Sequence, residues 1–573
     1  MDPFALLDDA RTGRATLYTR LTRVDRVDLS GLDAALAAGW DRGEHCLAWL
    51  PYDLAEAETG LRRPSAGALY WFAERRDVDL SEVLPEDGHG WLADTAPDVT
   101  EAEFATQVEA IRAAIAAGTS YQVNYTHRVT GRVVGSPAAL YARLRARQPV
   151  EFGVLARLPG PAAAWTLSLS PELFLHVADG VATSRPMKGT ADADSDPALL
   201  GTDPKNRAEN LMIVDLIRND LSRVSVPGTV AVDRLFQVER VGSLWQMTST
   251  VHGDLAPGTT PALLLSSLFP CGSITGAPKL ASMRLIRAAE PTARGLYTGA
   301  LGTIEPTDDP LGWRMDLSVV IRTLEIDAAG TTTLGVGSGI VTDSTAAAEW
   351  AECRAKARFA TDAGPTVHLR EAMRVVDGAA PLAARHRARL AASARALGFG
   401  DPGDAVARAV AETPRVGAWR VGLDVAPVGT ARVTRSPLAP LAGEVTVRLA
   451  PAPWRPGALA RHKTSARQLY DDAVRAAEDA GAFDTIGYDA DGYVLEGGRT
   501  SVLALVDGRW VTPPLDLGIL DGVQRAEILA RPELIDAGSI EERRLTVDEL
   551  RRADALVVTN AVRGVLPARL EES

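Results

Sequence analysis

A glycine–proline pair at residues 364 and 365 divides this chain of 573 residues. It follows residues 346–356, which have the composition of a strong helix. The helix is expected to end there because proline lacks a backbone N–H and restricts the residue before it. Domains usually hold roughly 100–200 residues, so a single hydrophobic core is not expected in a chain of this length. We therefore predict two independent domains, at residues 1–362 and 366–573.

Composition and charge exclude several classes of function. Hydrophobic residues make up 46% and charged residues 24% of the chain, as in an ordinary soluble protein. The net charge is −13 and no basic run occurs, so neither nucleic acid nor an anionic membrane is an expected partner. Three scattered cysteines match no zinc or disulfide pattern. We find no signal-peptide pattern and no apolar run of about 18 residues, so we expect no membrane span and a cytoplasmic location.

Amphipathic helices alternate with short strands along the chain, which indicates an α+β fold class. We predict helices at 101–117, 207–216, 346–356, 381–397 and 463–480, the last with Lys463 near its start. We predict strands at 121–126, 168–174 and 180–184, and a strand pair around the Asp-Gly turn at 491–492.

Residues 185–190, Arg-Pro-Met-Lys-Gly-Thr, place Lys188 directly after a predicted strand. A lysine at an apolar strand end loses hydration and is therefore partly neutral, and only a neutral amine is a nucleophile. Taken alone, this motif more often marks a solvated turn. The residues around it in the fold decide between the two interpretations.

Four glutamates form a second group of candidates. Glu172 lies among apolar residues of a predicted strand, where its pKa would rise into the range of a general acid. Glu209 opens an apolar helix, and Glu349 and Glu352 share one face of another, one turn before Lys356. Carboxylates that converge from two helices suit Mg²⁺, which prefers oxygen ligands. The alternative is that Glu172 is a surface strand residue and the others lie on solvated helix faces.

Two glycine-rich strings do not predict nucleotide binding. Residues 335–340 resemble a dinucleotide-binding loop, but no βαβ unit follows them. Residues 272–279 resemble a phosphate-binding loop but lack its Gly-Lys-Ser/Thr ending.

A series of motifs over about residues 100–360 resembles the chorismate-utilising enzymes. In chain order they are Ser-Pro-Glu-Leu-Phe (170–174), Arg-Pro-Met-Lys-Gly-Thr (185–190), Ala-Glu-Asn-Leu-Met-Ile-Val-Asp-Leu-Ile-Arg-Asn-Asp-Leu (208–221), Gly-Ser-Ile-Thr-Gly-Ala-Pro-Lys (272–279), Val-Ile-Arg-Thr (320–323), Gly-Ser-Gly-Ile-Val (337–341) and Glu-x-x-Glu (349–352). The resemblance implies a large α+β fold, with sandwiched antiparallel sheets around a Mg²⁺-dependent site.

The resemblance also implies roles for individual residues. Glu209 and Glu352 would hold the Mg²⁺, with Glu349 close by. The substrate-binding residues that it implies are Thr275, Tyr297, Arg322, Gly337, Gly339 and Lys356.

Lys188 indicates one subfamily, because aminodeoxychorismate synthases carry lysine at this position and anthranilate synthases carry alanine. The resemblance implies that Lys188 attacks C2 of chorismate as the C4 hydroxyl leaves. Ammonia then adds at C4 and expels the lysine, with Glu172 as general acid and base. The sequence has no glutaminase nucleophile motif, so a separate glutamine amidotransferase subunit would supply the ammonia. Asn206 and Gln246 depart from the residues usual in relatives.

A second set of motifs, over most of residues 367–570, resembles the class IV (fold type IV) pyridoxal-phosphate enzymes. It consists of residues 386–390, 461–465, 491–502, 512–515, 519–525 and 559–561. Lys463 would bind the aldehyde of pyridoxal 5′-phosphate covalently, and Glu496 would keep the pyridine nitrogen protonated. The phosphate would be held by Arg389, Val523, Gln524, Thr559 and Asn560. The class also implies a homodimer through this domain.

The two resemblances together imply a bifunctional enzyme of 4-aminobenzoate synthesis. The first domain would form 4-amino-4-deoxychorismate, and the second would remove pyruvate from it. The lyase assignment depends on the fusion, since the motifs do not separate lyases from branched-chain or D-amino-acid aminotransferases. Two alternatives stay open. One is an anthranilate- or isochorismate-type synthase joined to an aminotransferase, and the other is a chain in which one domain is inactive and acts as a scaffold.

Overall fold

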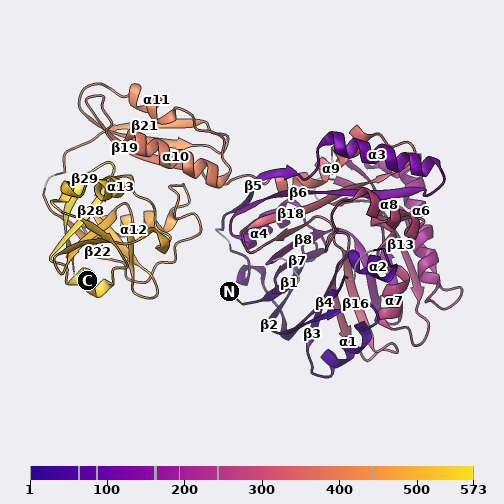
Figure 1. The fold of residues 1–573 in the computed structure, drawn as a ribbon. Helices are drawn as coiled ribbons and strands as arrows, with labels where there is room; N and C mark the ends of the chain where they lie inside the picture. Colours follow the sequence, from indigo (N-terminus) through magenta and orange to yellow (C-terminus); the bar gives the residue numbers. More distant parts are fainter. Residues whose placement is uncertain are drawn as a thin grey trace. The chain divides into compact units, whose positions relative to one another are not determined.

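The computed structural model describes residues 2–61, 65–85, 88–160, 164–192, 194–241, 244–441 and 443–571. The chain divides into two compact units, Met1–Ala363 and Gly364–Ser573 (Figure 1). Both units combine helices with sheets, as expected for the α+β class. Within the described ranges, no helix is both long and apolar enough to cross a membrane.

Unit 1 is built around one continuous series of antiparallel strands. Neighbours pair in the order β12–β13–β10–β9–β16–β15–β3–β4–β2–β1–β7–β8–β17–β18–β6–β5, while β11 pairs with β13 and β14 with β6. The strands are β1 (Phe4–Asp9), β2 (Arg14–Val27), β3 (His45–Leu50), β4 (Gly67–Asp77), β5 (Gly90–Pro97), β6 (Gln122–Gly135), β7 (Phe152–Arg157), β8 (Trp165–Ser170), β9 (Leu173–Ala178), β10 (Val181–Arg185), β11 (Met187–Asp192), β12 (Ala231–Val241), β13 (Leu244–Asp254), β14 (Gly276–Ala277), β15 (Ala300–Pro306), β16 (Trp313–Val319), β17 (Thr323–Ile326) and β18 (Thr331–Ile340).

Helices cover the outer faces of this series. They are α1 (Leu32–Trp40), α2 (Asp53–Glu58), α3 (Glu101–Ala116), α4 (Pro137–Arg147), α5 (Pro197–Thr202), α6 (Pro204–Ser222), α7 (Pro261–Leu268), α8 (Lys279–Ala289) and α9 (Ala346–Thr361). One core lies between α1, α6, α7 and the strands β3, β4, β9 and β16. A second lies between α3, α4, α8, α9 and the strands β6, β8, β17 and β18; Figure 1 shows α3 and α9 over β6 and β18.

A third core lies on the opposite face of β3 and its neighbours. Side chains alternate along a strand, so Cys46 and Ala48 face the helices while Leu47 and Trp49 face away. Trp49 packs there in one cluster with buried side chains of β2, β4 and β7. The central strands are therefore covered on both faces, as expected for sandwiched sheets.

The helix predicted at 101–117 is confirmed as α3, and its physical cause is clear. Thr100 caps its first turn, and Glu103 bonds back to the Thr100 amide in a capping box. Phe104, Val108 and Ile111 recur at helical spacing and are buried on one face.

Unit 2 contains two sheets. The smaller is antiparallel, in the order β19 (Leu369–Val376), β20 (Ala418–Val425), β21 (Ala431–Pro437), and is accompanied by α10 (Ala383–Leu397) and α11 (Ala405–Ala411). The larger has the order β24–β23–β22–β29–β28–β25–β26–β27. Its strands are β22 (Val445–Leu449), β23 (Asp484–Tyr488), β24 (Val494–Gly497), β25 (Ser501–Val506), β26 (Arg509–Thr512), β27 (Ile540–Glu542), β28 (Ala555–Asn560) and β29 (Gly564–Glu571), and the helices of this part are α12 (Gln468–Asp479), α13 (Val523–Ala530) and α14 (Val547–Arg551).

The prediction that Lys463 starts a helix is wrong. α12 begins only at Gln468, and Lys463 lies in a non-helical segment beside β19. The carbonyl of Lys463 accepts a 2.7 Å hydrogen bond from the amide of Arg370, and Thr464 bridges to Leu369. The backbone of residues 463 and 464 therefore bonds to β19 and does not form the helix that the local sequence favours.

Two other local predictions also need correction. Glu172 is not within a strand but in the two-residue link between β8 and β9, directly after Pro171. Glu209 does not open its helix, because α6 begins at Pro204 with Asp203 as its N-cap. Both glutamates nevertheless face the same site, as described below.

A buried ion pair of Arg294 with Glu290 connects two segments of unit 1, residues 272–279 and β6. Arg294 and Glu290 are only 3% and 5% exposed, and their side chains form two hydrogen bonds of 2.9 and 2.7 Å. Arg294 also donates to the carbonyls of Ile274 and Asn124, while Glu290 accepts from the amide of Thr126. The pair therefore joins the 272–279 segment to β6.

Replacing Arg294→Met should destabilise the protein by about 3–5 kcal/mol, because it leaves the Glu290 carboxylate buried without its partner. Arg218→Met is the matched control, since Arg218 pairs with Asp215 on the exposed surface of α6, and such pairs contribute about 1 kcal/mol or less. Urea denaturation of the full chain, followed by tryptophan fluorescence, measures both. Equal losses in the two variants would contradict the central role of the pair.

Candidate active sites

Lys188 lies on β11 with its amine against the backbone of β18. A Cβ atom placed on Gly339 would lie 3.7 Å from Lys188 Nζ, so the amine sits close to this glycine. Burial lowers the pKa of the Lys188 amine below its ordinary value, although the carboxylates of Glu209 and Glu172 act in the opposite direction. The amine is therefore more often neutral than that of a solvated lysine, which favours the nucleophile over the turn residue.

Glu172 lies in the same site and is almost fully buried, at 3% exposure. Burial raises the pKa of its carboxyl group, while a hydrogen bond from the Ser273 hydroxyl and the charge of Lys188 lower it. The net direction is upward, as a general acid near neutral pH requires. Ser273 comes from the 272–279 segment, so that motif supports Glu172 rather than binding a nucleotide.

The three predicted metal ligands come from two helices and interact with one another electrostatically. Burial raises the pKa of Glu209 on α6, and the charges of Glu352 and Glu349 on α9 raise it further. Within the described part of the chain, however, no three His, Cys, Asp or Glu side chains meet as ligands of one metal ion. Glu352 instead forms an ion pair with Lys356, in which Oε1 lies 2.6 Å from Nζ. The donor chemistry suits Mg²⁺, but a cation of the protein itself already occupies Glu352.

Lys356 was predicted to bind substrate, and the structure places it between α9 and β18. Besides Glu352, its ammonium donates a 2.9 Å hydrogen bond to the carbonyl of Gly337. Gly337 and Gly339 pack closely on β6, since a Cβ atom on either would come within 2.7 Å of a β6 atom. Gly337 requires glycine because it meets the backbone oxygen of Tyr125, whereas at Gly339 the close atom belongs to the side chain of Gln122.

Arg322 is placed to meet an anion. Its side chain is 7% exposed, and its Nη1 has no hydrogen-bond partner among the described residues. Burial lowers the pKa of the guanidinium to about 10, and Glu172 opposes this shift. Its backbone has φ +50°, an unfavourable conformation for arginine that often marks a functional position. A buried guanidinium with a free donor is suited to a substrate carboxylate.

Thr275 and Tyr297 line the same region but are engaged with protein atoms. The Thr275 hydroxyl donates to the carbonyl of Cys271 at 2.9 Å, and the Tyr297 ring fills the space where a Cβ atom of residue 335 would stand. Their predicted substrate contacts remain proposals.

Sequence reasoning missed Gln122, which opens β6. Its side chain is fully buried, and neither its amide oxygen nor its amide nitrogen has a partner among the described residues. A Cβ atom on Gly339 would lie 2.4 Å from its Nε2, so the amide is next to the site of Lys188. No local pattern distinguishes this glutamine from an ordinary polar strand residue. An unpaired buried amide is costly, which points to a ligand group at this position.

The residues that depart from the family pattern also lie near Lys188. The side chain of Asn206 packs against Gly189, 3.1 Å from where a Cβ atom would be. Gln246 is paired with residue 190 of β11, and its buried Oε1 has no described partner. Both contacts are consistent with supporting positions around the amine.

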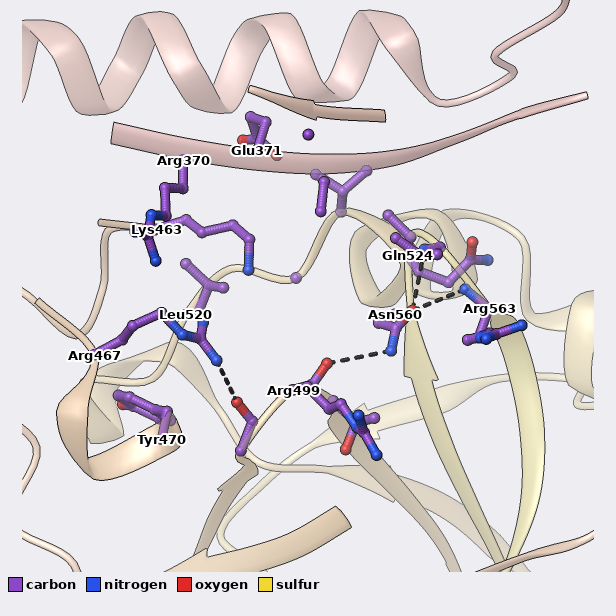
Figure 2. Close-up of a pocket in the computed structure, with 18 of the residues that line it drawn as sticks. Arg370, Glu371, Lys463, Arg467, Tyr470, Arg499, Leu520, Gln524, Asn560 and Arg563 are labelled. Atoms are coloured by element: carbon purple, nitrogen blue, oxygen red, sulfur yellow. Dashed lines mark hydrogen bonds between the residues drawn. The ribbon is translucent and has the colours of Figure 1, made fainter. Parts of the chain in front are cut away.

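Unit 2 has a cavity of about 1030 Å³, and Lys463 reaches into it (Figure 2). Burial lowers the pKa of the Lys463 amine to about 8, and the cations of Arg467 and Arg389 contribute. The neutral amine needed for reaction with an aldehyde is therefore available near neutral pH.

Glu496 on β24 lines the same cavity and is 5% exposed. It accepts hydrogen bonds from the Tyr470 hydroxyl at 3.0 Å and the Leu520 amide at 3.2 Å. Burial raises its pKa to about 7. A carboxyl group held this firmly fits the pyridine nitrogen of the cofactor.

Four of the five residues predicted for the phosphate line the cavity at the start of α13 and the end of β28, and the fifth, Arg389, lines it from α10. Val523 and Gln524 form the first turn of α13, whose N–H groups lack intrahelical partners. The Thr559 hydroxyl donates to the Gly564 carbonyl, and the side-chain oxygen Oδ1 of Asn560 accepts from two backbone amides, so both side chains hold the turn after β28. The group of residues fits pyridoxal phosphate.

Arg389, which was predicted to bind the phosphate, is engaged with other groups of the protein. It forms a bidentate ion pair with the buried Glu371 and donates to the Asp521 carbonyl. His386 Nδ1 donates a 2.7 Å hydrogen bond to the same carboxylate. Burial raises the pKa of Glu371, but Arg389 and His386 outweigh it and lower this pKa to about 2. Sequence reasoning missed Glu371 because its partners are 15 and 18 residues away in the chain.

Asp484 is a second residue that was missed, and it shapes the turn after Glu496. Its buried carboxylate accepts from the Arg499 amide and, at 2.6 Å, from the Thr500 hydroxyl. A Cβ atom on Gly497 or Gly498 would come within 3 Å of its oxygens, which explains the two glycines of this motif.

Comparison with known proteins matches each unit to a family. Residues 54–362 match the family described as chorismate binding enzyme, and residues 368–570 match the family described as amino-transferase class IV. The chain is 39% identical over 286 residues to anthranilate synthase component 1 of Streptomyces coelicolor, covering 49% of this chain and 54% of that protein. It is 36% identical over 324 residues to aminodeoxychorismate synthase component 1 of Klebsiella aerogenes, covering 52% and 70%.

A solved structure shows the same relationship for unit 1. The crystal structure of anthranilate synthase component I from Streptococcus pneumoniae is 25% identical, with a TM-score of 0.52, and the match covers 63% of this chain and 91% of that one. The chain spans about half the length of the Streptomyces coelicolor relative. The chain belongs to the chorismate binding enzyme family, and its matched region is followed by a class IV amino-transferase domain.

Proposed function

We propose that this enzyme converts chorismate to 4-aminobenzoate in two steps, one in each unit. The observation that carries the proposal is the amine of Lys188, whose pKa burial lowers, in one site with the buried carboxyl group of Glu172, whose pKa burial raises. This combination provides a nucleophile and a general acid in one site. The names of relatives such as the Klebsiella aerogenes protein support aminodeoxychorismate synthesis.

In the first step, the Lys188 amine bonds to C2 of chorismate while Glu172 donates a proton and the C4 hydroxyl leaves as water. Ammonia then adds at C4, and the C2–N bond to Lys188 breaks. Arg322 binds a substrate carboxylate through its free donor. Glu209 and Glu352 would hold Mg²⁺, with Glu349 nearby, and the bound ion would supply positive charge at the leaving oxygen.

A separate glutamine amidotransferase subunit supplies the ammonia. The designation "component 1" of the related synthases supports a two-part enzyme. The buried and unpaired amide of Gln122 lies beside Lys188 and supplies both a donor and an acceptor. We assign it to binding the incoming ammonia or the leaving oxygen.

In the second step, Lys463 holds pyridoxal phosphate, which supplies an electron sink when bound. Glu496 keeps a proton at the pyridine nitrogen, and the first turn of α13 binds the phosphate. The Lys463 amine would also move a proton, taking it from a ring carbon of the substrate. It then delivers this proton to the departing pyruvate.

Purified protein with chorismate, ammonium, Mg²⁺ and pyridoxal phosphate should yield 4-aminobenzoate and pyruvate. Without pyridoxal phosphate, 4-amino-4-deoxychorismate should accumulate, because only the second step needs that cofactor. Liquid chromatography with mass detection distinguishes these products. Anthranilate as the main product would overturn the proposal for unit 1, and a keto acid formed from added amino acids without 4-aminobenzoate would favour an aminotransferase in unit 2.

The variants Lys188→Ala and Lys463→Ala control for each other. Lys188→Ala should lose 4-amino-4-deoxychorismate formation, since no other group replaces the nucleophile, but should still convert supplied 4-amino-4-deoxychorismate. Lys463→Ala should show the reverse pattern. Coupled and single-step assays measure both activities, and loss of both steps in either variant would contradict two separate sites.

The rate at which cofactor-free protein takes up pyridoxal phosphate should rise with pH and level off above about 8. Only the neutral amine reacts, and burial lowers the pKa of Lys463 from 10.5 to about 8, so its neutral fraction rises through this lower range. Near-ultraviolet absorbance of the bound cofactor follows the reaction. Nα-acetyl-lysine is the control with an ordinary pKa, and a protein profile that keeps rising with it to pH 10 would show that Lys463 is not desolvated.

A further inference from the structure

Lys356 holds the position that a metal ion would need at Glu352. Its Nζ lies 2.6 Å from Glu352 Oε1 and 2.9 Å from the carbonyl oxygen of Gly337. Residues 352 and 356 are one helical turn apart on α9, so the contact forms without any change in the helix. The lysine thereby links α9 to β18.

The charges around this pair explain why a cation is needed there. The charges of Glu352 and Glu349 both act on Glu209. Three carboxylates in a partly buried site repel one another unless a cation lies among them. Lys356 supplies one such charge at Glu352, and the charges of Lys188 and Lys205 also act on this carboxylate. The side chains of Lys356 and Glu352 are 31% and 43% exposed.

A divalent ion cannot bind Oε1 of Glu352 while the Lys356 ammonium lies 2.6 Å from that oxygen. Two cations that contact one carboxylate oxygen lie about 3–4 Å apart, where their repulsion in a poorly solvated site is large. In agreement, the described side chains include no set of three ready metal ligands. Lysine has a flexible stem and a rotatable ammonium group, so it can leave the carboxylate while its helix stays in place.

We propose that Lys356 is a built-in stand-in for the metal, which occupies Glu352 until a divalent cation displaces it. This inference rests on the proposed function of unit 1, which requires the metal at Glu209 and Glu352. The displaced ammonium keeps its bond to the Gly337 carbonyl and turns toward the substrate side of β18. When the metal binds, one cation therefore replaces another, and a positive charge always lies beside the carboxylate of Glu352.

The test is a titration of the full chain with Mn²⁺ in the absence of substrate and pyridoxal phosphate. The electron paramagnetic resonance signal of free Mn²⁺ measures how much of the ion is bound. The variant Lys356→Met should bind Mn²⁺ about tenfold more tightly than the wild type, because the metal no longer competes with a bound ammonium. Glu352→Gln should weaken binding, which confirms that the titration reports this site. Circular dichroism establishes that each variant is folded, and Lys356→Gln is the second variant if Lys356→Met does not fold.

Lys205→Met separates direct occupation from a general effect of positive charge. Lys205 is exposed on α6, and its charge acts on both Glu209 and Glu352. Removing it should tighten Mn²⁺ binding by roughly twofold or less, since exposed charges are screened. Equal effects of Lys205→Met and Lys356→Met, or no tightening in Lys356→Met, would overturn the proposal. Neither result depends on which product the enzyme forms, so the proposed function stands or falls separately on the product assay.

Discussion

The buried pair of Arg294 and Glu290 is the interaction on which the Lys188 site depends. Both charges are removed from water, and this arrangement is tolerated only because every strong donor and acceptor finds a partner. Those partners are backbone groups of Ile274 and of β6. The pair therefore sets the position of the segment that carries Ser273 and of the strand that begins with Gln122. The arrangement of groups around the Lys188 amine therefore depends on a buried ion pair that need not contact the substrate.

The same physical principle operates at both lysines. Burial lowers the pKa of Lys188 and of Lys463, and burial raises the pKa of the carboxyl group that shares each site, Glu172 or Glu496. Desolvation disfavours the charged form of either group, so one environment produces a neutral amine and a protonatable acid together. The two units share no fold, but each obtains reactive groups near neutral pH in this way.

Much of the fold was accessible from local pattern, and the errors have a common cause. The helix at α3 was predicted to within one residue, since its cap and apolar spacing lie in one stretch of sequence. Lys463 was wrongly placed in a helix, because its backbone pairs with β19, almost a hundred residues earlier. Glu209 was wrongly placed at a helix start, because the cap at Asp203 was not recognised. Such errors arise where distant pairing or a capping residue competes with helix propensity.

The sequence by itself determined the two-part organisation, the candidate amines and carboxylates, and the resemblance to two enzyme families. Each of these depends on residue types and spacing along a short stretch of chain. Only the tertiary structure decided what each group contacts. It placed the unpaired amide of Gln122 beside Lys188, set Lys356 on Glu352, and joined Asp484 to the Gly497–Gly498 turn. These outcomes depend on distances and desolvation between segments far apart in the chain, and no local pattern encodes them.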